Sequence, residues 1–219
     1  AVAGVVLLQV FLDPGDARPY GGIANAYEKQ DSLEQSTNWL MKGLEHASGD
    51  GRLPLVQQLA ISNGQAGKFC DAIKYFREWV SLIPKDTDAV ATMANLAICY
   101  NGCKMYDSAI LTFREVLTIQ PSDLNALTGI GKYFRQMAGW AGDSSKVYDS
   151  LKNEAAAKRW RDIRNQRFDS SKVYMKQVFD ASPQDTLIAE EYGLICYLVG
   201  DYQSATAAFT RVTSLDATN

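Results

Sequence analysis

One pattern of apolar residues recurs along the chain and constrains its fold. In residues 67–84 an aromatic residue, Phe69, is followed by a small one, Ala72, and then by a second aromatic residue, Phe76. Residues 104–121 repeat this order, and both segments end at a proline. Residues 200–217 repeat it again, without the proline. Spacings of three and four residues place the side chains on one face of a helix. Each copy therefore predicts a helix with one apolar face.

A second pattern precedes these helices by about ten residues. In it a large apolar residue stands beside a very small one, as in Ile23–Ala24, Leu59–Ala60, Leu96–Ala97, Ile130–Gly131 and Tyr192–Gly193. The small residue allows two helix backbones to approach closely. Pairs of helices that are joined by a short turn and stacked in series bury apolar faces that one pair could not bury alone.

These residues resemble the tetratricopeptide repeat family, whose period is 34 residues. The resemblance implies an all-α fold, a right-handed solenoid built from helical hairpins, with about five repeats. In that frame the fourth repeat contains about 28 inserted residues. The repeats are expected near residues 17–50, 53–86, 90–123, 124–185 and 186–219.

The insertion interrupts the repeat frame between Phe134 and Phe168. A glycine-containing cluster predicts a turn at residues 139–143, and residues 145–167 are expected to form one long helix because they include many strong helix formers. Either an extra helix is added to the fourth repeat or one of its helices is extended.

The insertion is also the basic part of the chain. Only Glu154 and Asp162 oppose its basic residues. One interpretation is a docking surface for an acidic partner, an anionic lipid or RNA, with Trp160 as an apolar anchor. The other is a solvated helix face with Trp160 packed inward. The basic residues are Lys152, Lys158, Arg159, Arg161, Arg164 and Arg167.

Residues 1–12 contain no charge and one polar residue, Gln9. Residues 1–16 are interpreted either as the second helix of a partial preceding repeat or as the end of a membrane anchor. Twelve helical residues extend about 18 Å, which is less than the roughly 30 Å of a bilayer's hydrocarbon core. Leu7, Leu8 and Phe11 would face outward from such a helix, so we expect protein or lipid to cover them.

The charges that flank this segment bear on the compartment. Asp13, Asp16 and Arg18 show no positive excess, which favours a non-cytoplasmic membrane face. A soluble cytoplasmic protein is the alternative.

The four cysteines have different expected roles. Cys99 and Cys196 fall on positions that pack into a helical core. Cys70 and Cys103 lie near helix-to-helix turns of adjacent repeats, so a disulfide between them is geometrically conceivable in an oxidising compartment. No second ligand pair accompanies Cys99 and Cys103, and His46 is remote in sequence, so no metal site is expected.

Motifs for catalysis are lacking. The sequence contains no phosphate-binding glycine loop, no nucleophile elbow and no HExxH motif. Glu190 and Glu191 are adjacent and so point to different faces of a helix rather than acting as a pair. We therefore expect a protein that is not an enzyme and that uses no cofactor.

The family resemblance implies a concave groove lined by the first helix of each repeat. Amide side chains in such a groove can hydrogen-bond an extended backbone as donors and acceptors. Family members that clamp the carboxylate of chaperone tails need a set of residues that Asn25 begins but Gln58, Ala91 and Asn95 do not complete. The expected groove residues are Asn25, Glu28, Gln57, Gln58, Asn95, Asn101, Lys132, Arg135, Glu190, Glu191 and Tyr197.

The sequence predicts a non-catalytic scaffold for protein–protein interaction, a subunit of a multi-protein and membrane-associated complex. It would bind partners through the groove and the N-terminal helix. An assembly factor or chaperone that binds client peptides transiently is the alternative. RNA binding through the insertion is disfavoured, since the chain has 22 basic and 25 acidic side chains and a net charge of −3.

Overall fold

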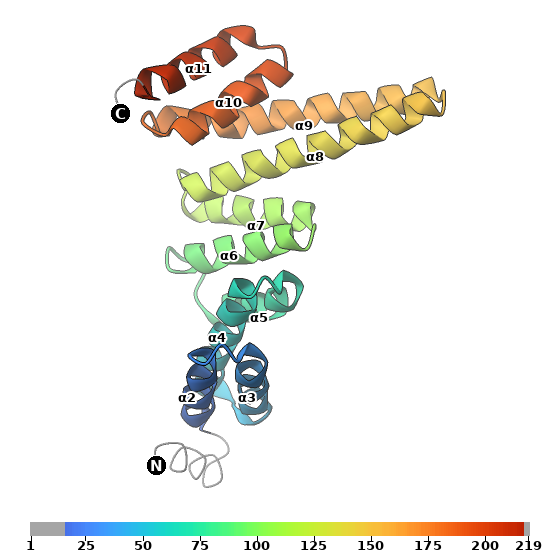
Figure 1. Ribbon diagram of the computed structural model, residues 1–219. Coiled ribbons are helices and arrows are strands. Elements are labelled where there is room, and N and C mark those ends of the chain that lie inside the picture. The colour runs from blue at the N-terminus through green and yellow to red at the C-terminus, as the bar shows by residue number, and fades with distance from the viewer. Residues whose placement is uncertain (1–15, 217–219) are drawn as a thin grey trace. The chain divides into compact units, whose positions relative to one another are not determined.

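The computed structural model describes residues 16–216 of the chain, and these residues form helices without a strand (Figure 1). The expected all-α fold is confirmed. Four pairs of consecutive helices pack as hairpins: α2 (Ala17–Glu28) with α3 (Leu33–His46), α4 (Arg52–Gln65) with α5 (Phe69–Leu82), α8 (Leu124–Ser150) with α9 (Glu154–Ala181), and α10 (Thr186–Leu198) with α11 (Tyr202–Asp216). Between the second and third of these pairs the chain forms α6 (Ala89–Gly102) and then α7 (Tyr106–Ile119). A short 3₁₀ turn, η1 (Gly49–Gly51), precedes α4.

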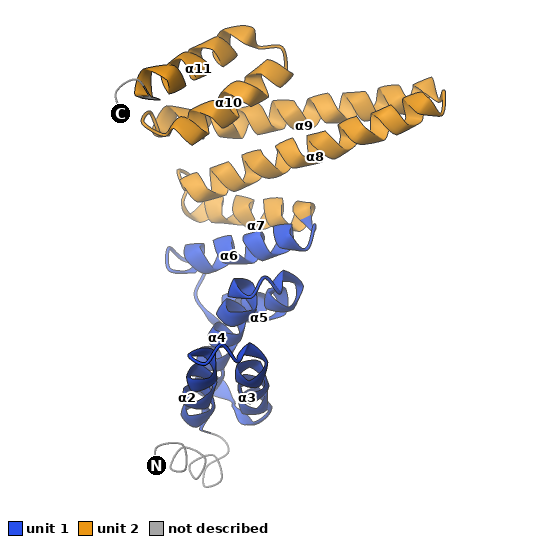
Figure 2. Cartoon of the chain, viewed as in Figure 1, with its two compact units in different colours: residues 1–105 blue, residues 106–219 orange. Residues whose placement is uncertain are grey.

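The chain divides into two compact units, residues 1–105 and residues 106–219 (Figure 2). The described part of unit 1 contains α2 to α6, and that of unit 2 contains α7 to α11. The division falls between α6 and α7, which are the two helices of the third expected repeat.

The turns inside the expected repeats share one backbone feature, a residue with a positive φ angle. Two of these residues are glycines, which reach this conformation at little cost. The others are polar residues at exposed turns. In chain order the residues are Asp31, Gly67, Lys104, Lys152 and Gly200.

Most of the first helices begin at an acidic side chain. In α8 the Asp123 carboxylate accepts a hydrogen bond from the backbone N–H of Ala126 at 2.7 Å. In α10 the Asp185 carboxylate accepts one from Ile188 at 3.0 Å. Such caps satisfy backbone donors that have no partner inside the helix and typically contribute about 1 kcal/mol each.

Small residues lie where the helices pack together, as the sequence pattern predicts. Ala72 in α5, Ala109 in α7 and Ala205 in α11 occupy equivalent places in their repeats and are buried. In α8, Gly131 faces Met175 of α9, whose Cγ atom would lie 2.7 Å from a Cβ atom at this glycine. Larger side chains at such crossings would overpack the core, at a typical cost of about 1–3 kcal/mol.

The inserted residues lengthen both helices of the α8–α9 hairpin. The turn expected at residues 139–143 is wrong, because α8 continues through this segment to Ser150. Gly142 is buried against α9, where the Arg164 side chain lies 3.3 Å from the place of its missing Cβ atom. This glycine allows close helix packing and does not end a helix. The single helix expected over residues 145–167 is also wrong, because Lys152 and the capping residue Asn153 form the turn instead.

The cysteines occupy the places that the repeat frame predicts. Cys70 at the start of α5 and Cys103 after α6 form a disulfide, with their Cα atoms 5.5 Å apart. Cys99 and Cys196 are free and buried. Burial raises the pKa of the Cys99 thiol to about 11, so this group stays protonated at neutral pH.

The expected contacts of Leu7, Leu8 and Phe11 lie outside the described residues, as does nearly all of the segment 1–16. Among the helices of residues 16–216, none combines the length and the apolar character needed to cross a bilayer.

Candidate functional site

A groove in unit 1 lies along the first helices α2 and α4, which pack against each other. We call it the α2–α4 groove. Its volume is about 620 Å³, and its lining includes Gly21, Gly22 and Asn25 of α2, together with Pro54 and Gln58 of α4. A Cβ atom at Gly22 would meet no heavy atom within 4 Å. The α2 wall therefore exposes backbone to whatever occupies the groove.

Two of the expected groove residues form a pair on the wall of this groove. The side-chain amide of Gln58 donates a hydrogen bond to Asn25 Oδ1 at 2.8 Å. This pairing uses the Asn25 oxygen and one Gln58 N–H, so the Asn25 amide group and the Gln58 oxygen keep further hydrogen-bonding capacity. The pair thus offers a donor and an acceptor side by side, as a peptide group does.

The lining of the groove also includes an ion pair between neighbouring residues. Asp16 accepts from the Arg18 guanidinium, with Oδ2 and Nη2 2.7 Å apart. Hydrogen bonds from Arg18 lower the pKa of the Asp16 carboxyl group. The carboxylate is therefore ionised at neutral pH and is already engaged with a cation.

The carboxylate of Glu28 faces neighbouring helices of unit 1 and is hydrogen-bonded there. It accepts hydrogen bonds from Ser36 Oγ of α3, at 3.1 Å, and from Ser62 Oγ of α4. Both serines are buried. Glu28 thus ties three helices together. Gln57 is half-buried on α4.

The other two expected groove residues of unit 1 lie on α6. Asn95 is exposed, whereas Asn101 is half-buried near the end of the helix. The Asn101 Oδ1 atom is buried and has no hydrogen-bond partner among the described residues. Asn95 is therefore the more accessible of the two amides.

In unit 2 the expected groove residues lie on the first helices α8 and α10. Arg135 of α8 forms an ion pair with Glu191 of α10, so these two side chains join the helices to each other. Lys132 and Glu190 are exposed. Tyr197 is 58% exposed and lies with its ring centroid 5.8 Å from that of Tyr202.

The basic residues of the insertion do not form one uniform face. Arg161 pairs with Asp149 of α8 at 2.9 Å, so the expectation that only Glu154 and Asp162 oppose the basic residues is wrong. The fold brings α8 alongside α9, and the sequence pattern of α9 alone could not reveal this partner.

The other insertion residues have varied surroundings. Arg164 hydrogen-bonds Asn165, and the Arg167 guanidinium lies 5.6 Å from the centroid of the Phe134 ring. Lys152 is exposed in the turn, and Lys158 and Arg159 are exposed on α9.

Two features of the site were not anticipated. Gly21 and Gly22 lie inside α2, where glycine lowers helix stability by about 1 kcal/mol relative to alanine. Two adjacent glycines in a helix therefore indicated a position where the backbone has a use, such as the wall of a groove. The pair formed by Lys172 of α9 and Asp201 was not inferred, because neither residue belongs to a motif that the repeat pattern identifies. The Lys172 hydrogen bond is the main reason that the pKa of Asp201 is lowered to about 2.

Comparisons with known proteins agree with this architecture. A family model described as tetratricopeptide repeat matches residues 90–123. The structure of MamA, residues 41 to the end, from Desulfovibrio magneticus RS-1 is similar with a TM-score of 0.65 and 17% identity, covering 93% of this chain and 97% of that chain. YrrB, described as a TPR protein with an unusual peptide-binding site, is similar with a TM-score of 0.64 and 12% identity, covering 97% and 93%.

A third similar structure is the C-terminal part of a TPR repeat-containing protein from Cytophaga hutchinsonii. Its TM-score is 0.63 at 16% identity, and the match covers 93% of this chain and 70% of that chain. At these identities the likenesses show a shared fold of stacked helical hairpins. No match is found among the curated proteins.

Proposed function

We propose that this chain, which belongs to the tetratricopeptide repeat family, is a non-catalytic scaffold that binds a segment of a partner protein in the α2–α4 groove. Members of this family are generally non-catalytic scaffolds for protein–protein interaction. The observation that carries the proposal is the amide pair of Asn25 and Gln58 on the wall of a groove that also exposes helix backbone at Gly22.

The chemistry of the groove fits a peptide. A segment with unpaired backbone N–H and C=O groups finds a complementary acceptor and donor at Gln58 and Asn25. Pro54, which is exposed, supplies apolar surface beside them. YrrB, which has a similar fold, is described as having an unusual peptide-binding site, and this supports peptide binding by the present chain.

Gly22→Leu tests this proposal. A leucine at this position obstructs the groove, yet its Cβ atom would clash with nothing within 4 Å, and leucine favours a helix more than glycine does. Affinity purification with the variant should lose the proteins that the wild-type chain captures, while thermal unfolding shows equal or greater stability. Gly139→Leu on α8 is the matched control, because Gly139 also has open space around it. Equal capture by both variants would contradict the proposal.

The finer part of the proposal is that the chain is a subunit of a multi-protein complex on the non-cytoplasmic face of a membrane. The Cys70–Cys103 disulfide supports an oxidising compartment. The apolar composition of residues 1–12 supports a contact with lipid or a membrane protein. Removing residues 1–15 should release the chain from sedimented membranes, and sedimentation that is unchanged would argue against this contact.

An assembly factor that binds its clients transiently is the second candidate. Polar groove residues that are already paired, such as Arg135 with Glu191, limit the number of strong contacts that a ligand gains in unit 2. A complex that survives purification favours the stable subunit, whereas exchange of added client peptide within minutes favours the assembly factor. RNA binding through the insertion would show a steep loss of affinity with salt.

A further inference from the structure

The extended part of the α8–α9 hairpin forms an arm, which we define as residues 141–167. Figure 1 shows α8 and α9 continuing past the ends of α7 and α10. The last ring contact between α7 and α8 is that of Tyr106 with Trp140, whose centroids are 4.5 Å apart. Beyond it, the arm is two helices thick.

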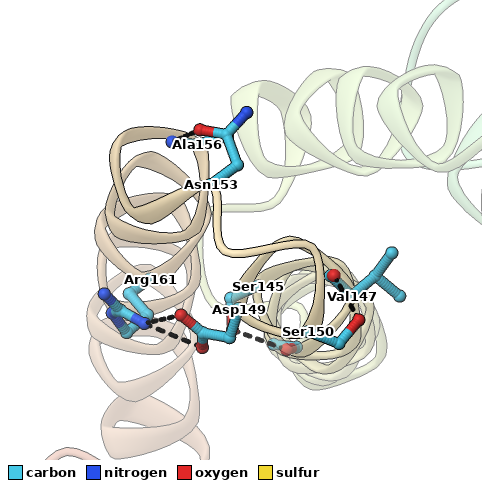
Figure 3. A network of polar contacts seen from close by, with 8 residues as sticks. Ser145, Val147, Asp149, Ser150, Asn153, Ala156 and Arg161 are labelled. Carbon is cyan, nitrogen blue, oxygen red and sulfur yellow. Dashed lines mark hydrogen bonds and ion pairs between the residues drawn. The ribbon is translucent and has the colours of Figure 1, made fainter.

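Polar contacts connect residues at the tip of the arm (Figure 3). Arg161 reaches from α9 to both oxygens of Asp149 on α8, each at 2.9 Å. Asn153 caps α9 by accepting from the backbone N–H of Ala156 at 3.1 Å. A surface held in this way loses little conformational entropy when it binds.

One side of the arm contains a pocket that we call the tip pocket. It has a volume of about 470 Å³, within the range of ordinary ligand sites. The two alanines in its lining leave space between the larger side chains. The lining residues are Tyr148, Ala155, Ala156, Arg159, Trp160 and Ile163.

The charge of the arm is opposite to that of the remaining chain. Residues 141–167 hold seven basic and four acidic side chains, a formal charge of +3, whereas the whole chain carries −3. Within residues 16–216, Lys152, Lys158 and Arg159 have no acidic partner, although Glu154 and Asp162 lie nearby in sequence. Arg159 both lines the tip pocket and keeps its guanidinium available.

We infer that the tip pocket binds an acidic segment of a partner protein, with one aromatic or large aliphatic side chain seated between Tyr148 and Trp160. A carboxylate next to that side chain would accept hydrogen bonds from Arg159, since the planar guanidinium binds carboxylates through two parallel bonds. This site deepens the proposed scaffold function by naming a partner chemistry, and it does not depend on the α2–α4 groove.

The form of the pocket favours a protein segment over a lipid surface. Trp160 and Tyr148 are half-buried and recessed, so their rings line a pocket instead of projecting toward a flat bilayer. Trp and Arg are also among the side chains that most often dominate the energy of protein interfaces.

Fluorescence anisotropy with the full chain tests this inference. The probes are short fluorescein-labelled peptides in which Glu and Asp residues flank one central Phe, Trp or Leu. Two control peptides replace the central residue with Ala or replace the acids with Gln and Asn. Binding should need both features, and high salt should weaken it.

Variants then locate the binding site. Arg159→Glu and Trp160→Ala should each weaken binding about tenfold or more, while Trp160→Phe should retain most of it. Arg114→Glu, the same charge reversal at an exposed position on α7, is the matched control and should bind as the wild type does. Arg159→Glu changes an exposed side chain, so it remains informative even if Trp160→Ala unfolds the arm.

Three results would overturn the inference. They are binding that is equal for the Phe and Ala peptides, binding that Arg159→Glu leaves unchanged, and binding to phosphatidylserine vesicles but to none of the peptides. Gly22→Leu should leave peptide binding to the arm intact. Failure of the arm is therefore distinguishable from failure of the α2–α4 groove.

Discussion

The disulfide between Cys70 and Cys103 should contribute a large share of the stability of unit 1. It links residues 33 positions apart, which is about one repeat, and so joins the start of α5 to the end of α6. For a loop of this length, the loss of chain entropy in the unfolded state corresponds to about 3.7 kcal/mol at 25 °C. Replacing both cysteines by serine should remove stabilisation of about this size.

Urea unfolding followed by circular dichroism measures the effect. The oxidised wild type should unfold at a higher urea concentration than the double variant, and dithiothreitol should move the wild type toward the variant. The variant itself should not respond to dithiothreitol, which makes it the control for other effects of the reductant. Thiol titration in denaturant should count two free cysteines in the oxidised protein, Cys99 and Cys196. Four free thiols, or wild-type midpoints that ignore the reductant, would refute this reasoning.

Two further substitutions test the packing and the electrostatics. Gly129→Ala should destabilise the protein by about 1 kcal/mol or more, because the new Cβ atom would lie 2.4 Å from the buried Phe113 ring; thermal unfolding should show no such loss for Gly139→Ala. Asp201 has a lowered pKa of about 2, so its stabilising effect is complete above about pH 4 and is lost as pH falls through 2. The difference in urea midpoint between wild type and Asp201→Asn should shrink over that interval; a constant difference would contradict the Lys172 ion pair as its cause.

The hairpins were predictable because their signals are local. Spacings of three and four residues define each helix face, and Ala72 or Ala109 marks a crossing because only a small side chain fits there. The inserted segment was harder to predict. Glycine can break a helix or allow close packing. Gly142 lies against α9 and allows close packing, whereas Gly139 has open space around it, and neither use follows from the local sequence.

In the candidate site, too, features that depend on one repeat were easier to predict than contacts between helices. Asn25 and Gln58 were selected by their repeat positions as candidate groove residues, and in the structure their side chains are hydrogen-bonded to each other. Glu28 accepts hydrogen bonds from Ser36 and Ser62 because three helices meet at this point. The position of Glu28 within its own repeat does not predict these contacts. Residue positions were therefore predictable to a greater degree than the interactions that each side chain makes.

The length of the two-helix arm can change without altering the body of unit 2. Ten residues of α8 lie in the arm, which at 1.5 Å per residue amounts to about 15 Å of reach. Shortening α8 and α9 by equal whole turns would keep their facing sides in register and leave the contacts of α7 and α10 untouched. The distance between the closing turn and the body of unit 2 can therefore change without any change in the core.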